Sequence, residues 1–128
     1  MELIAWEGLA ERVNADPEFA ENARFWSARL RLDFAGEASR CLHIEDGAVK
    51  EIEECAPSSD SDVSISAGLE DWAELLAELP KPFYQDIYGA AIYHGVEIDS
   101  GSVELAAYYP AVRRLIDILR EQRAGKGA

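Results

Sequence analysis

The sequence predicts an α+β fold in which one antiparallel-rich sheet carries helices on one face. Residues 26–34 alternate between apolar and polar side chains, as expected for a strand with one buried and one solvated face. Asp46-Gly47 lies between two further alternating segments and predicts a two-residue hairpin turn. Helical spacing is confined to the segments before and after these strands, and this segregation distinguishes α+β from alternating α/β folds.

Two helices are expected before the first strand. Apolar residues recur at helical spacing over residues 2–13, and Asn14 follows as a stop signal. Asp16-Pro17 then combines an N-cap residue with a proline at the first helical position, which predicts the start of a short second helix.

The strands are expected at residues 26–34, 41–45, 49–54 and 63–67, with a loop at residues 57–61. A regular two-residue turn at Asp46-Gly47 places Cys41 opposite Ile52. Cys55 then lies three positions along the hairpin from Cys41, beyond disulfide reach, so both thiols are expected to be free unless a bulge shifts the register.

Helical spacing returns after Gly68. Residues 69–79 carry an apolar stripe that ends at Pro80, and residues 83–93 carry a second apolar face. A short strand is expected at residues 96–98. Ser102 is the expected cap of a last long helix, which Pro110 kinks or divides.

Length and charge restrict the classes of function. The chain has 128 residues, 48 % hydrophobic, with 12 basic and 25 acidic side chains and a net charge of -13. This is the size of one domain, expected over residues 1–123, with residues 124–128 as a flexible tail. Residues 113–128 carry five basic and two acidic side chains, whereas the preceding residues carry seven and 23. A body this acidic repels phosphate backbones and anionic lipids, which argues against nucleic-acid binding and stable membrane insertion.

The sequence has no apolar run long enough to span a bilayer, and its first residues lack the pattern of a signal peptide. We therefore expect a cytoplasmic protein.

The clearest candidate site is an apolar wall formed by the last helices. Phe83, Ile87, Tyr88 and Ala91 on one helix are expected to face Tyr109, Val112 and Ile116 on another. Gly89-Ala90-Ala91 reduces the side-chain volume there. The same residues could equally interdigitate as an ordinary filled core, and spacing leaves both interpretations open.

No motif of catalysis or metal binding is evident. The sequence lacks a nucleophile elbow, a phosphate-binding loop and a dinucleotide fingerprint. His43 and His94 are far apart in sequence, and Glu51, Glu53 and Glu54 are typical of a solvated strand edge. We expect a protein that is not an enzyme, without a metal site and without cofactors.

Several segments together resemble the sterol carrier protein family. They are Asn14-Ala15-Asp16-Pro17 before the long strand, the hairpin at 41–47, the strand-to-helix passage at 62–72, and Gly95-Val96-Glu97-Ile98 before a helix. The resemblance covers residues 2–120. It implies a five-stranded, largely antiparallel sheet with helices on one face and an apolar tunnel between the two layers.

The resemblance also implies a function in binding a fatty acyl chain, an acyl-CoA, a sterol-like molecule or another lipid. On this basis the ligand-binding residues are expected to be Trp26, Leu30, Leu32, Trp72, Phe83, Ile87, Tyr88, Ala91, Tyr109, Val112 and Ile116. Arg113 and Arg114 are expected at the ligand's head group. The chain departs from the family at Tyr93-His94-Gly95-Val96, which lacks the usual lysine, and its tyrosines favour a smaller or polar-headed ligand.

The alternative hypothesis is a non-enzymatic interaction module, or an accessory subunit of an enzyme of lipid or aromatic-compound metabolism. Such a protein would have a filled core and would use its acidic surface to dock on a basic protein partner.

Overall fold

The computed structural model describes residues 3–35 and 37–123. It contains one five-stranded sheet in the order β3-β2-β1-β4-β5. The strands are β1 (Ala28–Phe34), β2 (Ser39–Glu45), β3 (Ala48–Cys55), β4 (Val63–Ala67) and β5 (Glu97–Ser100). Every neighbouring pair is antiparallel except β1 and β4, which are parallel. The predicted α+β class with a largely antiparallel sheet is confirmed.

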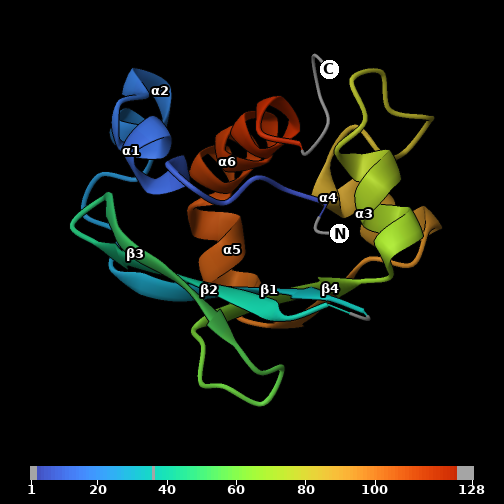
Figure 1. The fold of residues 1–128 in the computed structure, drawn as a ribbon, viewed down its shortest axis with the longest axis horizontal. Helices are drawn as coiled ribbons and strands as arrows, with labels where there is room; N and C mark the ends of the chain where they lie inside the picture. The colour runs from blue at the N-terminus through green and yellow to red at the C-terminus, as the bar shows by residue number, and fades with distance from the viewer. Residues whose placement is uncertain (1–2, 36, 124–128) are drawn as a thin grey trace.

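The helices cover one face of this sheet, here called the inner face (Figure 1). They are α1 (Leu9–Asn14), α2 (Pro17–Asn22), α3 (Leu69–Leu75), α4 (Ile87–Tyr93), α5 (Ser102–Ala107) and α6 (Tyr109–Glu121). Figure 1 shows α1 and α2 at one end of the layer, α6 in the middle, and α3 and α4 at the other end. The loop at residues 56–62 connects β3 to β4 and lies on the opposite side of the sheet, here called the outer face.

In residues 26–34, the apolar side chains of the alternating pattern face the core, as predicted. Trp26, Ala28, Leu30, Leu32 and Phe34 are all buried against the helices. On the outer face, Asp33 is buried as well. Its carboxylate accepts hydrogen bonds from Arg31 and from the Ser39 hydroxyl, which compensate for the loss of water. The strand itself begins only at Ala28, since Phe25 has a positive φ of 73° and is 77 % exposed.

The N-terminal segment differs from the prediction. The first described helix begins at Leu9, not at residue 2, because Gly8 adopts the left-handed conformation with φ 77°. The preceding residues are extended along the end of α6, where Ile4 pairs with Arg123 and the Ala5 N–H donates to the Gln122 carbonyl.

The hairpin between β2 and β3 contains a bulge that the sequence analysis missed. Ile44 pairs with Val49 as a regular Asp46-Gly47 turn requires, but His43 pairs with Glu51, so Lys50 has no partner. Cys41 therefore lies opposite Glu53, not Ile52, and Cys55 lies opposite Ser39. The bulge brings the Cys55 thiol within hydrogen-bond reach of Cys41, closer than the predicted offset, yet both cysteines are free.

The later helices are shorter than predicted. The helix after Gly68 ends at Leu75, and α4 begins at Ile87 with the Asp86 carboxylate accepting from the Gly89 N–H. Phe83 lies outside α4, in a loop, with φ 68°. The predicted break near Pro110 is confirmed, since α5 ends at Ala107 and α6 begins at Tyr109. Gly101, and not Ser102, occupies the cap position of α5.

The expected boundary between a domain at residues 1–123 and a flexible tail remains a prediction, because residues 124–128 lie outside the described part of the chain.

Candidate functional site

Most of the predicted ligand wall lies in the core between the sheet and the helices. Seven of its residues are at most 3 % exposed: Trp26, Leu30, Leu32, Trp72, Ile87, Val112 and Ile116. The structure therefore brings these residues into one apolar cluster. Their role as ligand contacts stays a prediction.

The two tryptophans of this wall are held by hydrogen bonds. The Trp26 indole N–H donates to Glu104 at 3.1 Å, and the ring stacks on Tyr108 with centroids 4.9 Å apart. The Trp72 indole N–H donates to the Asp33 carbonyl at 2.9 Å. Satisfied donors of this kind favour one orientation of each indole ring.

The remaining wall residues lie at or near α4. Tyr88 and Tyr109 are half-buried, and their rings touch with centroids 4.6 Å apart. Ala91 is also half-buried. Phe83 is 49 % exposed and stacks on Tyr93, which is 61 % exposed, at 4.0 Å. This part of the predicted wall therefore reaches the surface.

The Tyr109 hydroxyl is the most unusual polar group near α4. It is buried and makes no hydrogen bond of good geometry among the residues that the structure describes; the donor closest to making one is the Ile87 backbone N–H, whose weak contact lowers the pKa of the hydroxyl slightly. Burial raises the pKa of Tyr109 to about 12, and Asp86 and Arg113 both act on it electrostatically. A buried hydroxyl without a partner destabilises the protein by about 1–3 kcal/mol, which a ligand's polar group would offset.

The two predicted head-group residues differ in their surroundings. Arg113 is exposed and lies near the Tyr109 hydroxyl. Arg114 makes two hydrogen bonds to the Asp16 carboxylate, at 3.0 and 2.8 Å, and that carboxylate also caps α2 by accepting from the Phe19 N–H. The Arg114 hydrogen bond holds the pKa of Asp16 at about 2. The arrangement leaves Arg113 as the more accessible of the two.

Arg120 connects α6 to the region around α4. Its guanidinium donates to the Leu75 carbonyl at 2.9 Å and to the Gln85 carbonyl at 3.1 Å, and it pairs with Asp117 at 2.6 Å. One side chain therefore links α6 to the end of α3 and to the loop before α4.

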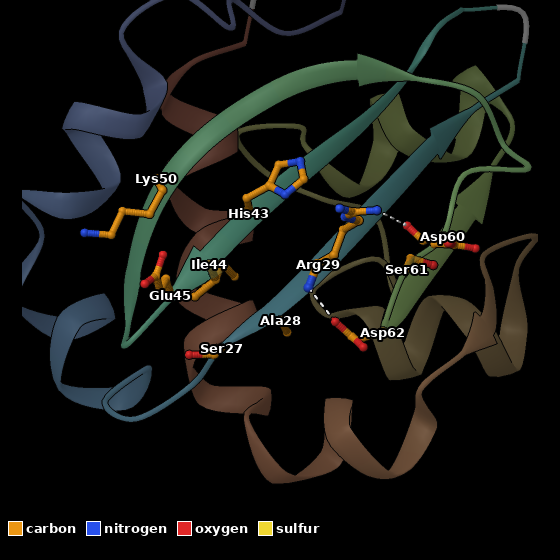
Figure 2. A pocket seen from close by; sticks show the side chains of 10 residues that line it. All are labelled: Ser27, Ala28, Arg29, His43, Ile44, Glu45, Lys50, Asp60, Ser61 and Asp62. Atoms are coloured by element: carbon orange, nitrogen blue, oxygen red, sulfur yellow. Dashed lines mark hydrogen bonds between the residues drawn. The ribbon is translucent and has the colours of Figure 1, made fainter.

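Two surface pockets lie away from the predicted wall. The larger, of about 510 Å³, is an open groove at the β1–β2 end of the outer face and is lined mainly by polar side chains (Figure 2). Arg29 and Asp62 lie on one side of it and His43 and Lys50 on the other (Figure 2). The second, of about 330 Å³, lies at the opposite end of β1, near Ala35 and Gly95. Sequence analysis did not predict either pocket, because both depend on the path of loops.

The outer face also gathers a histidine and two glutamates. The ligand atoms of His43, Glu51 and Glu53 all lie within 4.8 Å of one another. The other histidine, His94, stacks on the Tyr84 ring at 3.8 Å, while the Tyr84 hydroxyl donates to Asp71 at 2.6 Å. That hydrogen bond raises the pKa of Tyr84 to about 12.

No family model matches the chain, and no curated protein matches it in sequence. Solved structures show that the chain has the fold of sterol carrier proteins. The crystal structure of sterol carrier protein 2 superposes with a TM-score of 0.76 at 21 % identity, covering 91 % of this chain and 93 % of that one. A Thermus thermophilus protein described as "possibly sterol carrier protein" gives 0.76 at 22 %, covering 98 % and 93 %.

A ubiquinone synthesis protein titled UbiJ-SCP2 is more distant, with a TM-score of 0.56 at 15 % identity and 86 % of each chain covered. These likenesses confirm the fold that the sequence resemblance implied. In the described residues, no helix combines the length and apolar character needed to cross a membrane.

Proposed function

We propose that this protein binds an apolar molecule with a polar head group at the seam between α4 and α6, and acts as a carrier or sequestering protein. The observation that carries the proposal is the apolar surface of α4 and the loop before it. Leu79, Phe83, Ile92 and Tyr93 are 89, 49, 73 and 61 % exposed. Several exposed large apolar side chains along one short helix and its leading loop are typical of binding surfaces.

The residues beneath this surface suit an apolar chain. Ile87, Val112 and Ile116 are buried, and Ala90 and Ala91 give α4 small side chains, whereas Gly89 lies against the Phe83 carbonyl. Movement of α4 away from α6 would open an apolar slot without disturbing the sheet. Burying an acyl chain there would contribute roughly 25 cal/mol per Å² of apolar area removed from water.

The head group has candidate partners at the same place. The Tyr109 hydroxyl makes no hydrogen bond of good geometry among the described residues, and Arg113 lies near it on the exposed side of α6. A carboxylate or phosphate would accept hydrogen bonds from both groups. The fold shared with sterol carrier protein 2 supports the same class of ligand.

The protein is proposed to act without bond chemistry. Burial, together with a hydrogen bond to Cys55, raises the pKa of Cys41 to about 12. This thiol therefore stays protonated at neutral pH, whereas a catalytic cysteine needs a lowered pKa.

Titration of delipidated protein with the fluorescent fatty acid cis-parinaric acid tests the proposal. We expect saturable binding of one molecule per chain, with energy transfer from the protein's tryptophans to the probe. Ala91→Glu should abolish binding, because it places bulk and negative charge in the slot. Ala20→Glu makes the same change on the exposed side of α2 and should leave binding intact.

Two results would contradict the proposal. One is the absence of probe binding to a protein from which solvent extraction also recovers no lipid. The other is equal binding by the Ala91→Glu and Ala20→Glu variants.

The filled inner face favours a second candidate, an interaction module or accessory subunit. Trp72, Leu30 and Leu32 are at most 1 % exposed, and the net charge of -13 suits a basic protein partner. The likeness to a ubiquinone synthesis protein supports a role beside an enzyme of lipid or aromatic-compound metabolism. This function requires salt-sensitive binding to one basic protein that Ala91→Glu does not weaken.

A further inference from the structure

We propose that the outer face of the β2–β3 hairpin binds a divalent transition-metal ion, with His43, Glu51 and Glu53 as its protein ligands. The site lies on the opposite face of the sheet from α4. It is therefore independent of the proposed lipid function.

The bulge at Lys50 creates the site. In a regular hairpin with the Asp46-Gly47 turn, His43 would face Lys50, and Glu51 would share the inward face of Val49. The extra residue shifts the register by one, so that Glu51 lies directly opposite His43 and Ile52 opposite the buried Leu42. Bulges commonly re-aim side chains in this way.

The three side chains are arranged at nearly the spacing that a metal ion requires. The Nε2 atom of His43 lies 2.8 Å from Oε1 of Glu53, and all three ligand atoms lie within 4.8 Å of one another. Zinc bonds of about 2.0–2.1 Å in tetrahedral geometry hold ligand atoms about 3.3 Å apart. The Nε2–Oε1 pair would open by about half an ångström, and Glu51 would move inward by a side-chain rotation.

The donor set indicates which ions suit the site. One imidazole nitrogen and two carboxylate oxygens match Zn²⁺ and its transition-metal neighbours, whereas Ca²⁺ and Mg²⁺ prefer oxygen ligands alone. Three protein ligands leave a coordination position open to water, and His43 lines the open outer-face groove from which water would enter (Figure 2).

The positive charge of Arg29 limits the affinity of this site for a metal ion. Arg29 is the β1 partner of His43, and its guanidinium donates to the Asp60 carbonyl at 3.4 Å on the far side of the groove. Its positive charge opposes that of the ion. We therefore expect binding in the micromolar range, weaker than that of a structural zinc site.

Isothermal titration of the full chain with ZnCl₂, after removal of metals with a chelator, tests the proposal. We expect one Zn²⁺ per chain. Each of His43→Gln, Glu51→Gln and Glu53→Gln should weaken binding by roughly tenfold or more, since each replaces a ligand by the weaker amide oxygen of glutamine. Glu97→Gln removes the same charge from an exposed position on β5 and should not change the affinity.

A second measurement distinguishes zinc binding at this site from zinc binding to the cysteine thiols. Histidine ¹⁵N NMR should show a shift of the His43 Nε2 resonance on addition of Zn²⁺, and Cys55→Ser should not alter it. The absence of binding, binding unchanged in His43→Gln, or binding lost in Cys55→Ser would each overturn the proposal. Circular dichroism verifies that the variants, which change side chains at least partly exposed, remain folded.

Discussion

The two ends of the helical layer differ in how completely their apolar side chains are buried. At one end, here called the anchored end, α1 and α2 bury Leu9, Val13 and Phe19 completely, and the Asp16–Arg114 ion pair fastens α2 to α6. At the other, here called the α4 end, residues 76–94 leave Leu79 and Ile92 largely exposed. Low-stability regions are where ligand-dependent motion is expected. The proposed ligand access therefore falls at the less buried α4 end, and the anchored end is expected to support it.

The largest predicted change in folding stability comes from a substitution at the anchored end. Arg114→Ala should destabilise the protein by about 3 kcal/mol, because it removes both hydrogen bonds of Arg114 to the buried Asp16 carboxylate and leaves only Arg12, at 3.7 Å, as a charged partner. Chemical denaturation measures the loss. Arg24→Ala removes an exposed arginine 4.0 Å from Glu21 and should cost less than about 1 kcal/mol. Equal losses in the two variants would contradict the assignment of the anchor to Asp16–Arg114.

The same ion pair predicts a dependence of stability on pH. The Arg114 hydrogen bond lowers the pKa of Asp16 from 3.8 to about 2 in the folded protein. A carboxyl group whose pKa is lower in the folded state contributes stability above its unfolded pKa, and the contribution disappears as the pH falls through its folded pKa.

Urea unfolding between pH 5 and pH 2 should therefore show a steeper loss of stability for the wild type than for Asp16→Asn. Parallel pH profiles would show that Asp16 is not held by a charge interaction in the folded state.

A smaller effect is expected at the α4 end. Arg120→Met removes the hydrogen bonds to the Leu75 and Gln85 carbonyls and should cost about 1–2 kcal/mol. Amide hydrogen exchange should accelerate in α4 and the loop before it, whereas α2 should keep its protection. A uniform acceleration across both ends would mean that the two ends unfold as one unit.

The smallest effect is a gain in stability. Tyr109→Phe removes a buried hydroxyl that makes no hydrogen bond of good geometry among the described residues, and should stabilise the ligand-free protein by about 1 kcal/mol. If the hydroxyl bonds the head group, the same change should weaken fatty-acid binding by about fivefold. Calorimetric unfolding and probe titration measure the two quantities. Lower stability together with unchanged binding would exclude this role of Tyr109.

Local signals predicted much of this structure. The alternation of residues 26–34 identified the buried face of β1, Asp16-Pro17 marked the start of α2, and Pro110 divided the last helix. Each of these signals acts over a few residues, so it can be recognised without knowledge of the fold.

The features that sequence reasoning missed depend on contacts between distant segments. Asp16 and Arg114 are 98 positions apart, and nothing in either segment indicates that they pair. The hairpin bulge lets both the buried Val49 and the half-buried Ile52 lie on the inner face, which a regular hairpin cannot do. The left-handed Phe83 was assigned to a helix because its apolar spacing continues that of α4.

Chemical-shift mapping with ¹⁵N-labelled protein and a fatty acid such as oleate tests the central claim most directly. Ligand access at the α4 end predicts saturable shifts in residues 83–93 and 109–116, with residues 9–22 at the anchored end and residues 43–53 on the outer face unaffected. Shifts confined to the outer face, or none at saturating oleate, would contradict it.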